Sequence, residues 1–208
     1  MGESGEWDRA FDLLAPLAQW LYNRGRILDS LVELALFRKP EDLRLQNQGR
    51  LSTLLGQGWA GFGDLSQAAT LIRKAVNAFM QLAAQDPSNA EWQRDLSVSY
   101  DRIGDVLGAQ GSGEEALTAY RDSLEIRQRL AAQDPSNAQW QTDLVVSYWK
   151  LAQLLGGSAE TNAEAGALLE QGLAILYRQR DEARLSAEQE QWIDLFEHAL
   201  EGPPQANL

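Results

Sequence analysis

The chain has 208 residues, of which 44% are hydrophobic, and 30 acidic residues against 18 basic ones give it a formal net charge of -12. This hydrophobic content is enough for a packed core, which excludes a disordered chain. The absence of cysteine excludes disulfides, thiolate metal sites and a cysteine nucleophile. The negative charge opposes binding to nucleic-acid phosphates and favours a basic, neutral or apolar partner.

Neither a membrane segment nor a secretory leader is expected. No apolar run approaches the roughly 20 residues that cross a bilayer. The first six residues, Met1–Glu6, are acidic and lack the basic-then-apolar order of a signal peptide. We therefore expect a cytoplasmic protein that does not associate with membranes.

The first elements along the chain are two short amphipathic helices, predicted over residues 7–23 and 26–38. Together they form a degenerate hairpin over residues 5–38, because the second helix is about two turns shorter than a full one. Pro16 is expected to kink the first helix.

An internal repeat follows, and it is the strongest signal in the sequence. The segment Leu82–Leu96 returns almost verbatim as Leu130–Leu144, an offset of 130 − 82 = 48 residues. Steps of 48 residues, with one inserted residue in the last unit, also align small residues: Gly56, Ala68 and Ala75, then Gly104, Ala116 and Ser123, then Ala152, Ala165 and Gly172. The predicted units are therefore repeat 1 over residues 40–86, repeat 2 over 87–134 and repeat 3 over 135–182.

Each unit is predicted to form two helices. Apolar residues recur at helical spacing through the second unit, as in Trp92, Leu96, Tyr100, Ile103 and Leu107. Capping boxes indicate the helix starts: Asp64/Gln67, Ser88/Glu91, Ser112/Glu115, Ser136/Gln139, Thr161/Glu164 and Ser186/Gln189. The Asp-Pro pairs at 86–87 and 134–135 separate successive units. No alternating β-branched run predicts a strand.

The last element is an amphipathic capping helix over residues 186–201. Its predicted inward face comprises Trp192, Leu195, Phe196 and Ala199. Gly202, Pro203 and Pro204 end the helix, and residues 202–208 form a tail. An atypical terminal unit is expected in a repeat array, because the end of the stack must cover the last hydrophobic face.

These residues resemble the tetratricopeptide repeat (TPR), whose helix pair has the pattern Trp-x2-Leu-Gly-x2-Tyr, then Ala-x3-Phe. The matching residues of the second unit are Tyr100, Ile103, Gly104 and Leu107, followed by Ala116, Tyr120 and Ser123. The resemblance implies an all-α fold: a right-handed superhelix of about four helical hairpins plus a C-terminal capping helix, forming a single domain.

The repeat is longer than the roughly 34 residues of the standard unit, which suggests two extra turns in each helix. In this it resembles the arrays of bacterial signalling and defence proteins, which accompany caspase-like protease or STAND ATPase domains. The sequence contains neither catalytic domain.

No residue constellation predicts catalysis, a cofactor or a metal site. His198 is the single histidine and lacks the partners that catalysis or metal binding would need. Asp101 and Asp105 lie one turn apart and could share a cation, but such pairs are usually solvated or salt-bridged. The glycine-rich residues 56–63 lack the Gly-Lys-Ser/Thr ending of a phosphate loop and align with an inter-helix turn. We expect a protein that is not an enzyme.

The resemblance also implies a concave face lined by the first helix of each hairpin. Its expected partner-binding residues are Thr53, Gln57, Asp101, Asp105, Trp149 and Gln153, with Gln19 and Ala15 as weaker equivalents in the first hairpin. Trp149 aligns with Thr53 and Asp101, so the repeat core does not require an aromatic residue there. The alternative is that Trp149 is buried against the capping helix.

Two functions follow from this face. The first is a protein-interaction scaffold whose groove binds a peptide or protein, either basic or with an apolar anchor. The second is a structural or regulatory arm that mediates homo-oligomerisation or controls a separate catalytic component. The basic clamp with which some family members hold chaperone C-termini is absent, so that ligand is not expected.

Overall fold

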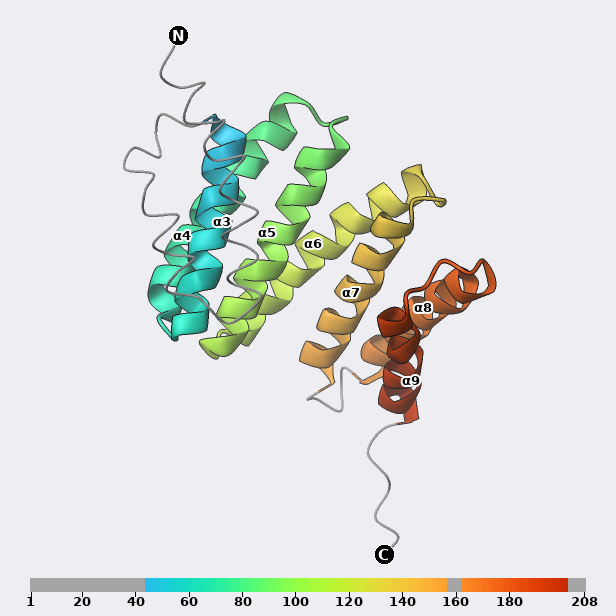
Figure 1. The fold of residues 1–208 in the computed structure, drawn as a ribbon. Coiled ribbons are helices and arrows are strands. Elements are labelled where there is room, and N and C mark those ends of the chain that lie inside the picture. The colour runs from blue at the N-terminus through green and yellow to red at the C-terminus, as the bar shows by residue number, and fades with distance from the viewer. Residues whose placement is uncertain (1–43, 157–161, 202–208) are drawn as a thin grey trace, which may run out of the picture. The chain divides into compact units, whose positions relative to one another are not determined.

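The computed structural model describes residues 44–156 and 162–201, and these ranges contain helices but no strand (Figure 1). The seven helices are α3 (Leu45–Phe62), α4 (Leu65–Gln85), α5 (Ala90–Ala109), α6 (Gly113–Gln133), α7 (Ala138–Leu155), α8 (Asn162–Asp181) and α9 (Ala187–Glu201). The prediction of an all-α fold is confirmed. The helices α3 to α8 run to 18–21 residues, which accounts for the long repeat.

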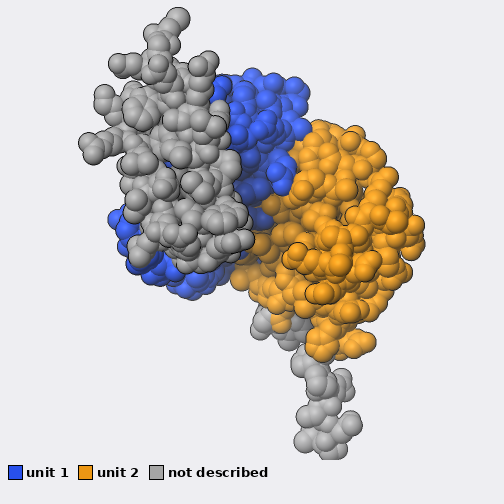
Figure 2. Space-filling view, in the orientation of Figure 1, with its two compact units in different colours: residues 1–119 blue, residues 120–208 orange. Residues whose placement is uncertain are grey.

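The helix bounds fall inside the three predicted repeat ranges and the predicted cap, although the domain division itself stays a prediction. The predicted first hairpin (residues 5–38) and the tail (202–208) lie outside the described residues. By its internal contacts the chain separates into two compact units, residues 1–119 and 120–208 (Figure 2). The boundary falls within α6.

The helix starts follow local hydrogen bonds that the capping analysis predicted in part. Asp64 accepts a bond from the amide of Gln67, and Ser186 and Gln189 form the reciprocal box. The box predicted at Ser88 is wrong by one residue: Asn89 caps α5, because Ser88 donates to the carboxylate of Asp86 in the preceding turn. The same shift places Asn137 at the start of α7.

The turns between paired helices use glycine where the backbone requires it. Gly63 after α3 has φ = 88°, and Gly111 after α5 has φ = 81°, a conformation in which a side chain would be strained. The two positions are 48 residues apart. Of the glycine-rich residues 56–63, only Gly63 lies in the turn, since α3 continues to Phe62.

In the first unit, α3 and α4 cross closely because α3 carries glycine at the contact points. A Cβ atom on Gly49 would lie 2.8 Å from the ring of Phe79, and one on Gly56 would lie 2.5 Å from Cγ1 of Ile72. Both of these α4 side chains are 1% exposed. Small residues at the crossing thus permit the close packing that the sequence alignment predicts.

Within residues 120–208, a buried arginine joins α6 to α7 by hydrogen bonds. Arg127 is 4% exposed and stands where the other repeats have Phe79 and Leu176. Its Nη1 donates to the carbonyl oxygen of Asp143 at 2.8 Å and to the hydroxyl of Ser147 at 2.9 Å. These bonds satisfy a polar group that would otherwise be costly to bury.

The cap α9 packs onto α8 through a close aromatic contact, and the hydroxyl of Tyr177 on α8 also donates to the carboxylate of Glu197 on α9. Phe196 of α9 is 1% exposed, and a Cβ atom on Gly172 of α8 would lie 2.4 Å from its Cε1. Gly172 thus leaves room for the ring. This contact helps to place α9 against α8, and with it one wall of the candidate site.

Candidate functional site

The predicted concave residues of the first unit are largely engaged in contacts within the chain. Thr53 is half-buried and donates to the carbonyl oxygen of Gly49 at 3.1 Å. Gln57 is 7% exposed, and with its amide oxygen turned towards Arg102 it accepts a bond from Nε at 2.6 Å. Gln19 and Ala15 lie outside the described residues.

The two aspartates of α5 are also placed by neighbouring groups. Asp101 is 4% exposed. Asp105 is more accessible and forms an ion pair with Arg102 at 3.7 Å. Among the four predicted positions described in this unit, Asp105 and Thr53 therefore retain the most accessible surface.

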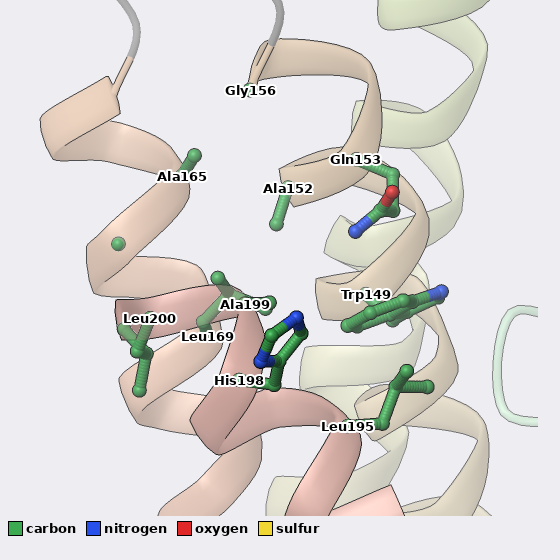
Figure 3. A pocket seen from close by; sticks show the side chains of 11 residues that line it. Trp149, Ala152, Gln153, Gly156, Ala165, Leu169, Leu195, His198, Ala199 and Leu200 are labelled. Carbon is green, nitrogen blue, oxygen red and sulfur yellow. The ribbon is translucent and has the colours of Figure 1, made fainter. Parts of the chain in front are cut away.

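In the second unit, Trp149 and Gln153 line a pocket formed by α7, α8 and α9 (Figure 3). Its volume is about 760 Å³, within the range of about 300–1,000 Å³ typical of ligand-binding clefts. The lining residues are Trp149, Ala152, Gln153, Gly156, Ala165, Gly166, Leu169, Leu195, His198, Ala199 and Leu200.

Small side chains on all three helices create this volume. The small lining residues are Ala152 of α7, Gly156 directly after α7, Ala165 and Gly166 of α8, and Ala199 of α9. Larger side chains elsewhere on these helices keep the backbones apart. The small residues therefore leave space between the helices. The site is therefore a pre-formed apolar hollow.

Trp149 forms one wall of the pocket and is half-buried. Its ring centroid lies 5.1 Å from that of Phe196, with the ring planes tilted by 41°. Such aromatic contacts hold a side chain in a defined orientation. The alternative of burial against the capping helix therefore describes the Phe196 contact, while the rest of the ring borders the pocket.

The α9 wall carries residues that sequence reasoning missed. Leu195 was predicted to face inward, but it is 45% exposed and stands at the pocket edge, because Ile193 and Phe196 make the buried contacts of α9. His198 of α9 lines the pocket together with Trp149 of α7 (Figure 3). Its proximity to α7 follows from tertiary packing, and no motif in the sequence indicates it.

The described residues show neither a membrane-spanning helix nor a metal-binding cluster. No described helix is long and apolar enough to cross a membrane. Within residues 44–156 and 162–201, no cluster of three or more histidine, aspartate or glutamate side chains has the geometry of a metal site. The chemistry of the pocket is thus that of an apolar surface with an amide and an imidazole at its rim.

Comparison with solved structures identifies the architecture. A kinesin light chain-like protein of Podosopora anserina with nearly identical TPR-like repeats superposes with a TM-score of 0.61 at 16% identity, covering 98% of this chain and all of that one. BtubC (BKLC) from P. vanneervenii gives a TM-score of 0.53 at 14% identity, covering 93% of this chain and 80% of that one.

These likenesses confirm the predicted TPR-like helical-repeat fold. No protein-family model matches the chain, and no curated protein sequence matches it.

Proposed function

We propose that this chain is a protein-interaction scaffold whose α7–α8–α9 pocket receives an apolar side chain of a peptide or protein partner. The observation that carries the proposal is the exposure of large apolar surface at a pre-formed hollow: Trp149 is half-buried and Leu195 is 45% exposed. Apolar surface gathered at a concave site favours a partner that removes it from water.

Pre-organisation explains how such a site would bind. Trp149 is held by Phe196, which is in turn fixed against Gly172, so little side-chain freedom is lost when a ligand enters. Gln153 is exposed at the rim, and its amide offers both a donor and an acceptor to a peptide backbone. Tryptophan is enriched among residues that dominate binding energy.

The proposal includes the setting that the long repeat suggests: a cytoplasmic protein of a bacterial signalling or defence system that acts without catalysis. The accessible groups of the first unit, Thr53 and Asp105, would add polar contacts to an extended partner. A self-associating arm would instead show a concentration-dependent mass in sedimentation experiments without any added partner.

Selection from a random peptide library tests the function. Peptides enriched on the wild-type chain are synthesised, and their affinities are measured by fluorescence anisotropy. Trp149→Ala and Leu195→Ser should each weaken binding by about 2 kcal/mol, the usual threshold of a hot spot. Leu195 is largely exposed, so its replacement leaves the core intact.

Met80→Ser is the matched control, because Met80 of α4 is 46% exposed and lies outside the pocket. It should leave affinity unchanged. Thermal unfolding of each variant separates lost binding from lost folding. Peptides that bind Leu195→Ser and Trp149→Ala as tightly as the wild type would refute a role for this pocket.

A further inference from the structure

The pocket is bordered by negative charge along α9. This helix carries Glu188, Glu190, Asp194, Glu197 and Glu201 and has no lysine or arginine. Glu190, Asp194 and Glu201 are exposed and share a helical stripe with His198, since residues four and seven apart lie on one face. Because Leu195, His198, Ala199 and Leu200 line the pocket, Asp194 and Glu201 directly precede and follow the part of α9 that forms its wall.

The α8 wall also carries a negative charge. Two repeats have an arginine at one position of their second helix, and the third repeat has a glutamate there. Arg73 of α4 forms an ion pair with Glu115 of α6 at 3.2 Å, and Arg121 of α6 forms one with Glu164 of α8 at 2.9 Å. The repeat alignment, with its one inserted residue, places Glu170 at the corresponding position of α8. Glu170 is exposed and lies one helical turn after Gly166 of the pocket.

Among the described residues, Arg121 reaches the α8 wall, but it is already engaged by Glu164, the neighbour of Ala165. Arg178 and Arg180 lie at the opposite end of α8 from Gly166. The nearest basic residue in sequence to the α7 wall is Lys150, whose amine lies 5.5 Å from the centre of the Tyr120 ring. The described walls therefore combine an apolar hollow with a negative rim.

Resting on the proposed function, we infer that the partner is a basic peptide segment with one or two large apolar side chains. The apolar side chains enter the hollow beside Trp149 and Leu195. Lysine or arginine residues that flank them lie against Glu170, Asp194 and Glu201. Exposed ion pairs add little affinity individually, but their complementarity selects the partner's charge and speeds association. The same carboxylates disfavour a phosphate-rich nucleic acid or an anionic membrane.

Three labelled synthetic peptides of about twelve residues, long enough for helix-in-groove binding, test this inference on the full chain. The first combines lysines with two leucines at helical spacing. The second replaces every lysine by glutamate, and the third keeps the lysines and replaces the leucines by serine. We expect the first to bind at least about tenfold more tightly than the others, and to weaken by about tenfold between low and high salt.

Charge-neutral variants locate the effect. The triple variant Glu170→Gln, Asp194→Asn and Glu201→Gln should weaken binding of the basic apolar peptide by about tenfold. The matched control neutralises the same number of carboxylates away from the pocket, with Glu125→Gln, Asp181→Asn and Glu182→Gln, all exposed. It should change affinity by less than about twofold, as expected of distant screened charges.

The outcomes separate this inference from the proposed function. If the glutamate peptide binds best, and Leu195→Ser still weakens its binding, the pocket is a docking site but the inferred charge is wrong. Equal losses from the rim and control variants would also overturn the inference, since they would show a general charge effect. If no peptide binding responds to Leu195→Ser or Trp149→Ala, both proposals fail.

Discussion

Replacing Gly172 by alanine tests the contact that holds the site together. The added Cβ atom would lie 2.4, 3.1 and 3.2 Å from three ring carbons of Phe196, which is 1% exposed. Overpacking of this kind costs about 1–3 kcal/mol. The better helix propensity of alanine offsets about 1 kcal/mol. We expect a net loss of about 1 kcal/mol in the free energy of unfolding.

The same substitution at Gly166 is the control, because it lies in the same helix with nothing within 4 Å of the added atom. Gly166→Ala should stabilise the chain by about 0.4–1 kcal/mol. The two substitutions should therefore change the free energy of unfolding in opposite directions. The difference of about 2 kcal/mol between them measures the contact with Phe196. For a chain of this size 1 kcal/mol corresponds to a shift of about 2–4 °C in Tm.

Urea unfolding followed by circular dichroism measures both variants. Gly172→Ala should be less damaging when Phe196→Leu is introduced with it, because the ring that clashes is gone. Stabilisation by Gly172→Ala equal to that of Gly166→Ala would refute the packing of α9 on α8 described above.

The remaining predictions concern the repeat core, its turns and its surface. Ala116 is fully buried, so Ala116→Leu should overpack the α5–α6 hairpin and cost about 1–3 kcal/mol or more; an unchanged thermal melt would contradict the repeat alignment. Hydrogen bonds from Ser88 and Ser136 lower the pKa of Asp86 and of Asp134 below the ordinary 3.8, so the stability they add is present above that pH and is lost as pH falls through the folded-state pKa. NMR titration should show both midpoints below 3.8, and Ser88→Ala should raise that of Asp86. Arg73→Ala and Arg121→Ala should each cost less than about 1 kcal/mol in denaturant unfolding, because both ion pairs are exposed; a larger loss would show that they set the stacking of the repeats.

Local chemistry in the sequence was enough to predict the helices of the described residues. Helical spacing and the Asp-Pro pairs separate α4 from α5 and α6 from α7 at nearly the residues observed. The capping prediction was wrong by one residue at Asn89 and Asn137, because the hydroxyl of the preceding serine has two possible hydrogen-bond partners. Ser88 can cap a helix or donate to Asp86, and only the backbone conformation decides between them.

The sequence pattern is sufficient to predict the repeat: its 48-residue period, its two helices per unit and the small residues at their crossings. These depend on neighbours within one or two turns, which a linear pattern records. The pocket depends instead on which surfaces meet after packing. Leu195 has the spacing of a core residue, yet it is exposed because Phe196 occupies the room that Gly172 leaves. The volumes of side chains on two different helices determine this packing, so the place of Leu195 and His198 beside Trp149 at the pocket follows from the folded structure and not from the sequence pattern.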